Sequence, residues 1–174
     1  LPGSASVLAK RIDGNCPDLD GNGLEELLLW LLQADLGTYF DGTEGPFGEF
    51  IDEISKWVLQ FFKDGNGEEK LLDLVTKLRD SVYESGTPRQ LLFGDVIAAV
   101  LRKKLENSAW KALPLYSGLP RDKWLHALQK DSFIKELWPA QHLLGKADVL
   151  KGESAIVQMP TSAGKTKATE LILR

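Results

Sequence analysis

One short segment of the sequence combines the residue types that bind a phosphate group. It reads IVQMPTSAGKT, residues 156–166, and its end matches the pattern Gly-x-x-x-x-Gly-Lys-Ser/Thr, with Met159 in place of the first Gly. Backbone N–H groups of such a loop can surround a phosphate, and Gly164 lets the backbone approach it closely. We expect Lys165 to neutralise phosphate oxygens and the hydroxyl of Thr166 to coordinate Mg²⁺. Lys165 and Thr166 are therefore the predicted catalytic residues, and Thr166 is the predicted metal ligand.

The residues on either side of this loop indicate how it would be held. SAIVQM, residues 154–159, is a short apolar run bounded by Pro160, which predicts a β-strand. TKATELILR, residues 166–174, predicts a helix whose positive end would face the phosphate. The sequence therefore predicts a strand, then a phosphate loop, then a helix.

The segment MPTSAGKT, residues 159–166, resembles motif I of the superfamily 2 helicases, in which the first Gly is commonly another residue. The variant is most similar to that of repair-type DNA helicases and related RNA-remodelling helicases. Helical domains ahead of such motors also occur in bacterial antiphage-defence helicases. The resemblance covers residues 135–174 and implies a RecA-like domain, ATP and Mg²⁺ as cofactors, and ATP hydrolysis. It also implies a motif II carboxylate pair and arginine fingers, which do not follow within the 174 residues.

The same helicases place a Gln about two dozen residues before the motif I Lys, where it reads the edge of adenine. Gln141, in LWPAQ, lies 24 residues before Lys165. Its amide offers a donor and an acceptor, as pairing with adenine requires, although an ordinary helix-surface position is the alternative. Trp138 and Trp124 are candidates for packing on the adenine, but a Trp is more often part of a core. The predicted cofactor-binding residues are Gln141, Thr161, Ser162, Ala163, Gly164, Lys165, Thr166 and Lys167.

The rest of the chain is predicted to be helical, because its apolar residues recur at helical spacing. The expected helices span residues 24–36, 47–63, 68–85, 88–106, 122–130 and 139–150, with a short helical piece near Ala109. The predicted fold class is mainly α: an N-terminal helical bundle followed by the beginning of a RecA-like α/β P-loop domain. The predicted domains are a helical accessory domain at 1–118 and a truncated ATP-binding domain at 119–174.

A single strand raises the question of what pairs with it. The N–H and C=O groups of residues 155–159 would have no neighbouring strand within this sequence. We therefore expect the sequence to be a piece of a longer protein, and the segment by itself to be inactive as an ATP hydrolase.

Composition excludes several classes of protein. Cys16 is the one cysteine and there are two histidines, so a disulfide framework or a cysteine or histidine metal cluster is not expected. DLDGNGLEELLL, residues 18–29, begins like a calcium loop, but Leu29 stands where the bidentate Glu is required, and an acidic turn before a helix explains the same residues. No apolar run is long enough for a membrane span, and we expect a cytoplasmic protein without a membrane partner.

Charge divides the chain unevenly. Residues 1–86 hold 17 Asp and Glu against 7 Lys and Arg, whereas residues 87–174 hold 8 against 14. The basic half is compatible with a polyanion partner or with a solvated basic face. The acidic half favours a protein partner.

These observations predict the N-terminal portion of an ATP-dependent nucleic-acid helicase or translocase of antiviral defence. We expect it to act on nucleic acid, DNA in preference to RNA, and to bind a protein partner such as a nuclease subunit through the acidic helical domain. The alternative is a helical protein-interaction module of a larger motor complex, with no catalysis of its own. A different P-loop enzyme, such as a kinase or GTPase, is a third interpretation.

Overall fold

The computed structural model describes residues 23–33, 36, 45–160 and 164–173. Its helices are α2 (Leu24–Leu31), α3 (Gly48–Asp64), α4 (Glu68–Ser85), α5 (Pro88–Asn107), α6 (Ala109–Ser117), α7 (Arg121–Leu128), α8 (Pro139–Lys146), the 3-10 helix η1 (Val149–Lys151) and α9 (Lys165–Leu173). The described chain divides into two compact units. The N-terminal unit holds Leu1–Phe61 and Gly65–Lys103, and the C-terminal unit holds Phe62–Asp64 and Lys104–Arg174.

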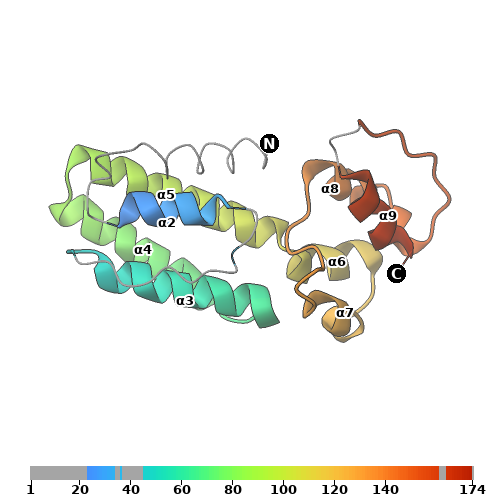
Figure 1. The fold of residues 1–174 in the computed structure, drawn as a ribbon, viewed down its shortest axis with the longest axis horizontal. Helices are drawn as coiled ribbons and strands as arrows, with labels where there is room; N and C mark the ends of the chain where they lie inside the picture. Colours follow the sequence, from blue (N-terminus) through green and yellow to red (C-terminus); the bar gives the residue numbers. More distant parts are fainter. Residues whose placement is uncertain (1–22, 34–35, 37–44, 161–163, 174) are drawn as a thin grey trace. The chain divides into compact units, whose positions relative to one another are not determined.

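In the N-terminal unit, α2, α3, α4 and α5 lie side by side as a bundle (Figure 1). Each helix buries one apolar stripe, as the helical spacing of its residues predicts. The core side chains with no exposed surface are Leu27 and Leu31 of α2, Ile51, Ile54 and Val58 of α3, Leu71, Leu78 and Val82 of α4, and Ile97 and Leu101 of α5. The predicted helical bundle is thus present, and the periodicity that predicted it is the feature that builds its core.

Local residues decide where these helices begin and end. Gly65 ends α3 with a φ of 73°, and Gly67 precedes α4 with a φ of 90°, a region that favours glycine. The start of α5 has a reciprocal cap: the N–H of Thr87 donates to Gln90 Oε1 at 2.7 Å, and the N–H of Gln90 donates to Thr87 Oγ1 at 3.3 Å. Pro88 follows at the first helical position, where its missing N–H costs nothing.

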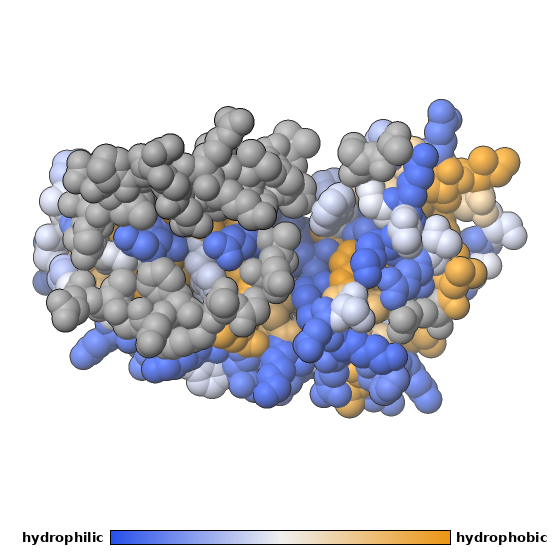
Figure 2. Space-filling model, in the orientation of Figure 1, coloured by the Kyte–Doolittle hydropathy of each residue, from blue (hydrophilic) through white to orange (hydrophobic). Residues whose placement is uncertain are grey.

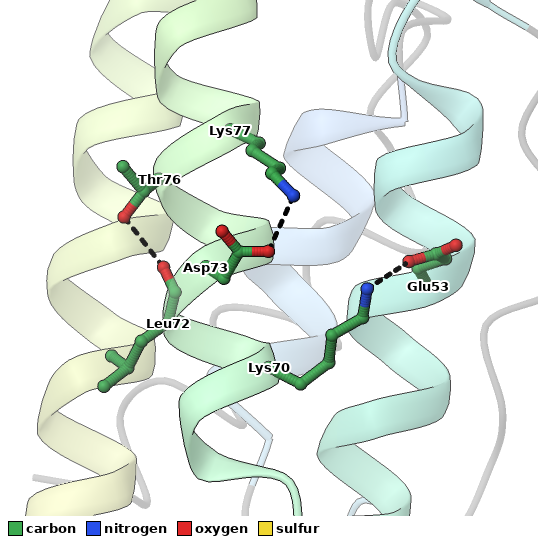
Figure 3. Close-up of polar contacts among 6 residues, drawn as sticks. All are labelled: Glu53, Lys70, Leu72, Asp73, Thr76 and Lys77. Carbon is green, nitrogen blue, oxygen red and sulfur yellow. Dashed lines mark hydrogen bonds and ion pairs between the residues drawn. The ribbon is translucent and has the colours of Figure 1, made fainter.

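Polar contacts on the bundle surface add little to its stability. Lys70 of α4 lies 3.7 Å from the carboxylate of Glu53 of α3, and Lys77 pairs with Asp73 within α4 at 2.8 Å (Figure 3). Exposed pairs of this kind contribute about 0–1 kcal/mol each. A less exposed link joins α2 to α5, where Arg89 Nε donates to Glu25 Oε1 at 2.7 Å and Glu25 is buried. The apolar core therefore carries the bundle.

The C-terminal unit is built around two apolar clusters. The larger cluster joins α6, α7, the segment before α8, and α9, through Ala109, Trp110, Ala112, Leu113, Trp124, Leu128, Phe133, Leu137 and Leu171. The smaller one consists of Leu144 of α8, Val149 of η1 and Ala168 of α9, with Met159 partly buried against it. Because α9 contributes to both clusters, it is anchored to the unit along one face.

The α/β part of the predicted fold class is wrong. The described residues contain helices and an isolated bridge between Ser108 and Glu136, and the predicted strand at 154–159 has no regular secondary structure and belongs to no sheet. Ile156 is fully exposed and Val157 is 42% exposed. Figure 2 shows hydrophobic surface on the side of the C-terminal unit that carries residues 152–160 and α9. A strand needs neighbours for its N–H and C=O groups, and none of the described segments supplies one, so no RecA-like sheet forms.

The divisions in the structure differ from the sequence-based domain limits. The predicted boundary at 118/119 falls between α6 and α7, inside the C-terminal unit. The two compact units instead divide near the ends of α3 and α5. In the C-terminal unit, Trp110 Nε1 donates to the carbonyl oxygen of Phe62, and Lys104 forms an ion pair with Glu136. Both contacts lie within the C-terminal unit, which includes the last residues of α3 and α5. None of the helices in the described part of the chain is long and apolar enough to cross a bilayer.

Candidate nucleotide-binding site

The predicted phosphate loop leads directly into α9. Gly164 has a φ of 77°, and its carbonyl oxygen accepts the N–H of Ala168 at 2.9 Å, so Gly164 forms the start of the helix. Lys165 and Thr166 occupy the first turn, and both are exposed. The first N–H groups of a helix lack intrahelical acceptors and favour an anion. Thr161, Ser162 and Ala163 lie outside the described residues.

Gln141 occupies the third position of α8, where its side chain caps the helix. The backbone N–H of Trp138 donates to Gln141 Oε1 at 2.8 Å, and Gln141 is 1% exposed. Pro139 stands at the first position, which contributes no N–H. The cap fixes the orientation of the amide, because Oε1 must face Trp138 and Nε2 must point the other way.

The fold brings Gln141 and Trp138 against the start of α9. A Cβ built on Gly164 would lie 3.4 Å from Gln141 Nε2 and 3.4 Å from the nearest carbon of the Trp138 ring. The two segments that the resemblance connects with adenine and with phosphate are therefore neighbours, although 22 residues lie between Gln141 and Gly164 in the sequence. Trp138 remains 36% exposed, as a surface on which a ring could pack.

The other predicted residues have different surroundings. Trp124 is 6% exposed in the larger apolar cluster, and its indole N–H donates to Ser117 Oγ at 2.9 Å, which makes it a core residue. Lys167 Nζ donates to the carbonyl oxygen of Ser132 at 3.0 Å and to Glu170 Oε2 at 3.1 Å. Lys167 thus holds α9 to the segment before α8, whereas Lys165 lines an open hollow.

This open hollow along α9 has a volume of about 580 Å³ and is lined by Lys165, Thr166, Thr169, Glu170 and Leu173. It contains the predicted lysine and the predicted magnesium ligand together. Glu170 adds an acidic group at its edge, which Lys167 partly neutralises. Among the described residues, no group of three or more His, Cys, Asp or Glu side chains is arranged to hold a metal ion. Any Mg²⁺ bound at Thr166 would therefore take its other ligands from phosphate oxygens and water.

Sequence reasoning missed the contacts that support α8. The Tyr116 hydroxyl and His142 Nδ1 lie 2.9 Å apart, and the two rings meet edge to face with centroids 5.6 Å apart. Gly145 lies against the same tyrosine, because a Cβ there would be 2.2 Å from the ring. Lys135 Nζ donates to the carbonyl oxygen of Leu128, the last residue of α7, and to that of Lys130 just beyond it, and burial lowers the pKa of Lys135. Spacing along the chain does not reveal such pairs.

Comparisons with known proteins give one distant similarity. The chain is 26% identical over 121 residues to the Hachiman protein HamB of Bacillus cereus. The match covers 67% of this chain and 11% of HamB, so the chain spans a small part of that protein's length. No family model matches the chain, and no solved structure matches it significantly.

Proposed function

We propose that the start of α9 binds the polyphosphate of ATP, within an ATP-dependent nucleic-acid helicase or translocase of antiphage defence. One observation carries this proposal: Gly164, at the head of α9, lies against Gln141, the residue that the helicase resemblance connects with adenine. The distant similarity to the Hachiman protein HamB supports the defence setting. The helicase activity belongs to the proposal and rests on residues 135–174.

The positions of Gly164, Lys165 and Thr166 allow the roles proposed for them. Lys165 and Thr166 are exposed in the first turn of α9, so the ammonium group can approach phosphate oxygens and the hydroxyl can approach Mg²⁺. Gly164 has no side chain to separate a phosphate from the backbone. Gln141 is buried, with Oε1 accepting the Trp138 N–H and Nε2 directed towards Gly164, so contact with an adenine would require these neighbours to move.

Nucleotide binding to the chain tests this proposal. We expect calorimetry to detect Mg²⁺-ATP binding, and Lys165→Ala to weaken it by about tenfold or more, since a charge-assisted contact to phosphate is worth roughly 1.5–3 kcal/mol. Lys167→Ala is the matched control, because Lys167 contacts Ser132 and Glu170, and its loss should have a smaller effect. Equal losses for the two lysines, or no binding by the parent chain, would argue against the site. In the whole protein, Lys165→Ala should abolish ATP turnover.

The N-terminal unit supports a second role, protein interaction without catalysis. Its residues include 17 Asp and Glu against 9 Lys and Arg, whereas the C-terminal unit has 8 against 12. A net charge of −8 disfavours nucleic acid and favours a basic protein surface. We propose a protein partner there, with a nuclease subunit as one candidate, while the basic unit faces nucleic acid. Binding of the protein partner to the N-terminal unit that weakens steeply with salt would support this arrangement. Binding of that partner that does not depend on salt would contradict it.

A further inference from the structure

Trp138 and Gln141 at the start of α8 lie beside Gly164 at the start of α9. Trp138 precedes the first residue of α8, Gln141 caps it, and Gly164 precedes the first residue of α9. The amide nitrogen of Gln141 and the ring of Trp138 both lie at contact distance from the position that a Cβ of Gly164 would take. The start of α9 therefore lies next to one buried amide and one aromatic ring, both from the start of α8.

From this geometry we infer that Gln141 and Trp138 are positioning residues for the polyphosphate site, and that they act through Gly164. The inference rests on the proposed function. Gly164 has a left-handed φ of 77°, and its carbonyl oxygen accepts the first helical hydrogen bond of α9, from Ala168. A shift of Gly164 would therefore move the first turn, including Lys165 and Thr166. Gln141 consequently affects phosphate binding as well as the choice of base.

A second capping glutamine provides the matched control. Gln90 also stands at the third position of a helix, is 9% exposed, and accepts the N–H of the capping residue at 2.7 Å. It belongs to α5 in the N-terminal unit, whereas Gln141 belongs to the C-terminal unit. Gln90→Ala and Gln141→Ala therefore remove the same kind of cap, but of the two glutamines it is Gln141 that lies beside Gly164.

The binding experiment compares Mg²⁺-ATP, Mg²⁺-GTP and magnesium tripolyphosphate, which has no base. If Gln141 positions Gly164, Gln141→Ala weakens the binding of all three ligands by about fivefold or more. This is the change in an equilibrium constant that the loss of one helix cap typically causes. If Gln141 only reads adenine, the variant loses its preference for ATP and binds tripolyphosphate as the parent does, which overturns the inference and leaves the proposed function standing. Gln90→Ala should leave all three affinities unchanged, and equal losses in both variants would also overturn the inference.

Hydrogen exchange tests the same contact without a nucleotide. The Ala168 amide, which donates to Gly164, should exchange about fivefold faster or more in Gln141→Ala and in Trp138→Ala. Trp138→Phe, which keeps a ring against Gly164, should restore the slow rate, and Gln90→Ala should not change it. An Ala168 rate that is unaffected by Gln141→Ala would overturn the inference. If the parent binds none of the three ligands, the proposed function fails, and the exchange rates alone decide whether Gln141 positions Gly164.

Discussion

At the scale of single residues, Asp95 shows how a polar contact ties two helices together. The hydroxyl of Tyr83 donates to Asp95 Oδ2 at 2.7 Å, and Arg79 Nε donates to Oδ1 at 2.7 Å. The hydrogen bond from Tyr83, and after it the one from Arg79, lowers the pKa of Asp95 below its ordinary value of 3.8. Both donors lie on α4 and the carboxylate lies on α5, so ionised Asp95 favours the packed bundle.

A lowered pKa of a carboxyl group makes the stability depend on pH in a defined direction. The contribution of Asp95 is present above pH 3.8 and is lost as the pH falls through its lower folded-state pKa. We expect Asp95→Asn to lower the melting temperature at neutral pH, and the difference from the parent to shrink below pH 3.8. Thermal unfolding between about pH 2 and pH 7 measures this. Asp73→Asn, which removes an exposed pair with Lys77 inside α4, is the control. A constant difference across this range would contradict the prediction.

At the scale of elements, two helical glycines differ in the space around them. In α8, a Cβ at Gly145 would lie 2.2 Å from the ring of Tyr116, a distance that no real Cβ tolerates. In α5, a Cβ at Gly94 would lie 3.6 Å from Val82, in ordinary contact. Helix propensity alone predicts the same gain from Gly→Ala at both positions, since Ala is favoured over Gly by about 1 kcal/mol in a helix interior. The closeness of α8 to α6 therefore depends on Gly145.

The two Gly→Ala substitutions should have opposite effects on the free energy of unfolding. Gly94→Ala should stabilise the chain by about 0.5–1 kcal/mol. Gly145→Ala should destabilise it by about 1–3 kcal/mol, because the Tyr116 ring must move and its contact with His142 is disturbed. Urea denaturation measures both. In a Tyr116→Ala background, Gly145→Ala should no longer destabilise the chain, and a cost that persists there would show that the cause is not the ring.

At the scale of the whole molecule, charge follows the division into units. The C-terminal unit has a net charge of +4 and the N-terminal unit a net charge of −8. The basic unit also contains the candidate ATP site, so the proposed nucleic-acid contact and nucleotide contact belong to the same unit. This distribution of charge predicts that a polyanion binds to the C-terminal unit.

We expect the chain to bind single-stranded DNA weakly, through residues of the C-terminal unit. With two or three phosphate contacts, a rise in salt from roughly 50 to 200 mM should lower the affinity about tenfold. Hydrogen exchange with and without DNA should show protection within 104–173 and none within 68–103. An RNA of the same sequence should bind less tightly, as the resemblance to repair-type DNA helicases implies. Protection confined to the N-terminal unit would contradict the prediction.

The sequence by itself determined the helices, because helix formation depends on local spacing and local caps. The apolar repeat of α4 predicted its limits, Glu68–Ser85, without error, and Pro88 marked the start of α5. The helix after the phosphate loop is present as predicted, and it begins at Lys165, one residue before the predicted start at 166. The same spacing predicted α2 and α8 too long, since helix ends depend on packing as well as pattern.

Only the tertiary structure decided what depends on partners distant in the chain. Residues 154–159 have the composition of a strand, but a strand requires neighbours, and the described chain provides none. Trp124 and Trp138 look alike in sequence, yet one is buried in the core and the other lies against Gly164. Local pattern alone places Gln141 on a helix surface, whereas the fold buries it as a cap against the start of α9. Burial and long-range contact are properties of the packed chain, and a pattern of neighbouring residues does not contain them.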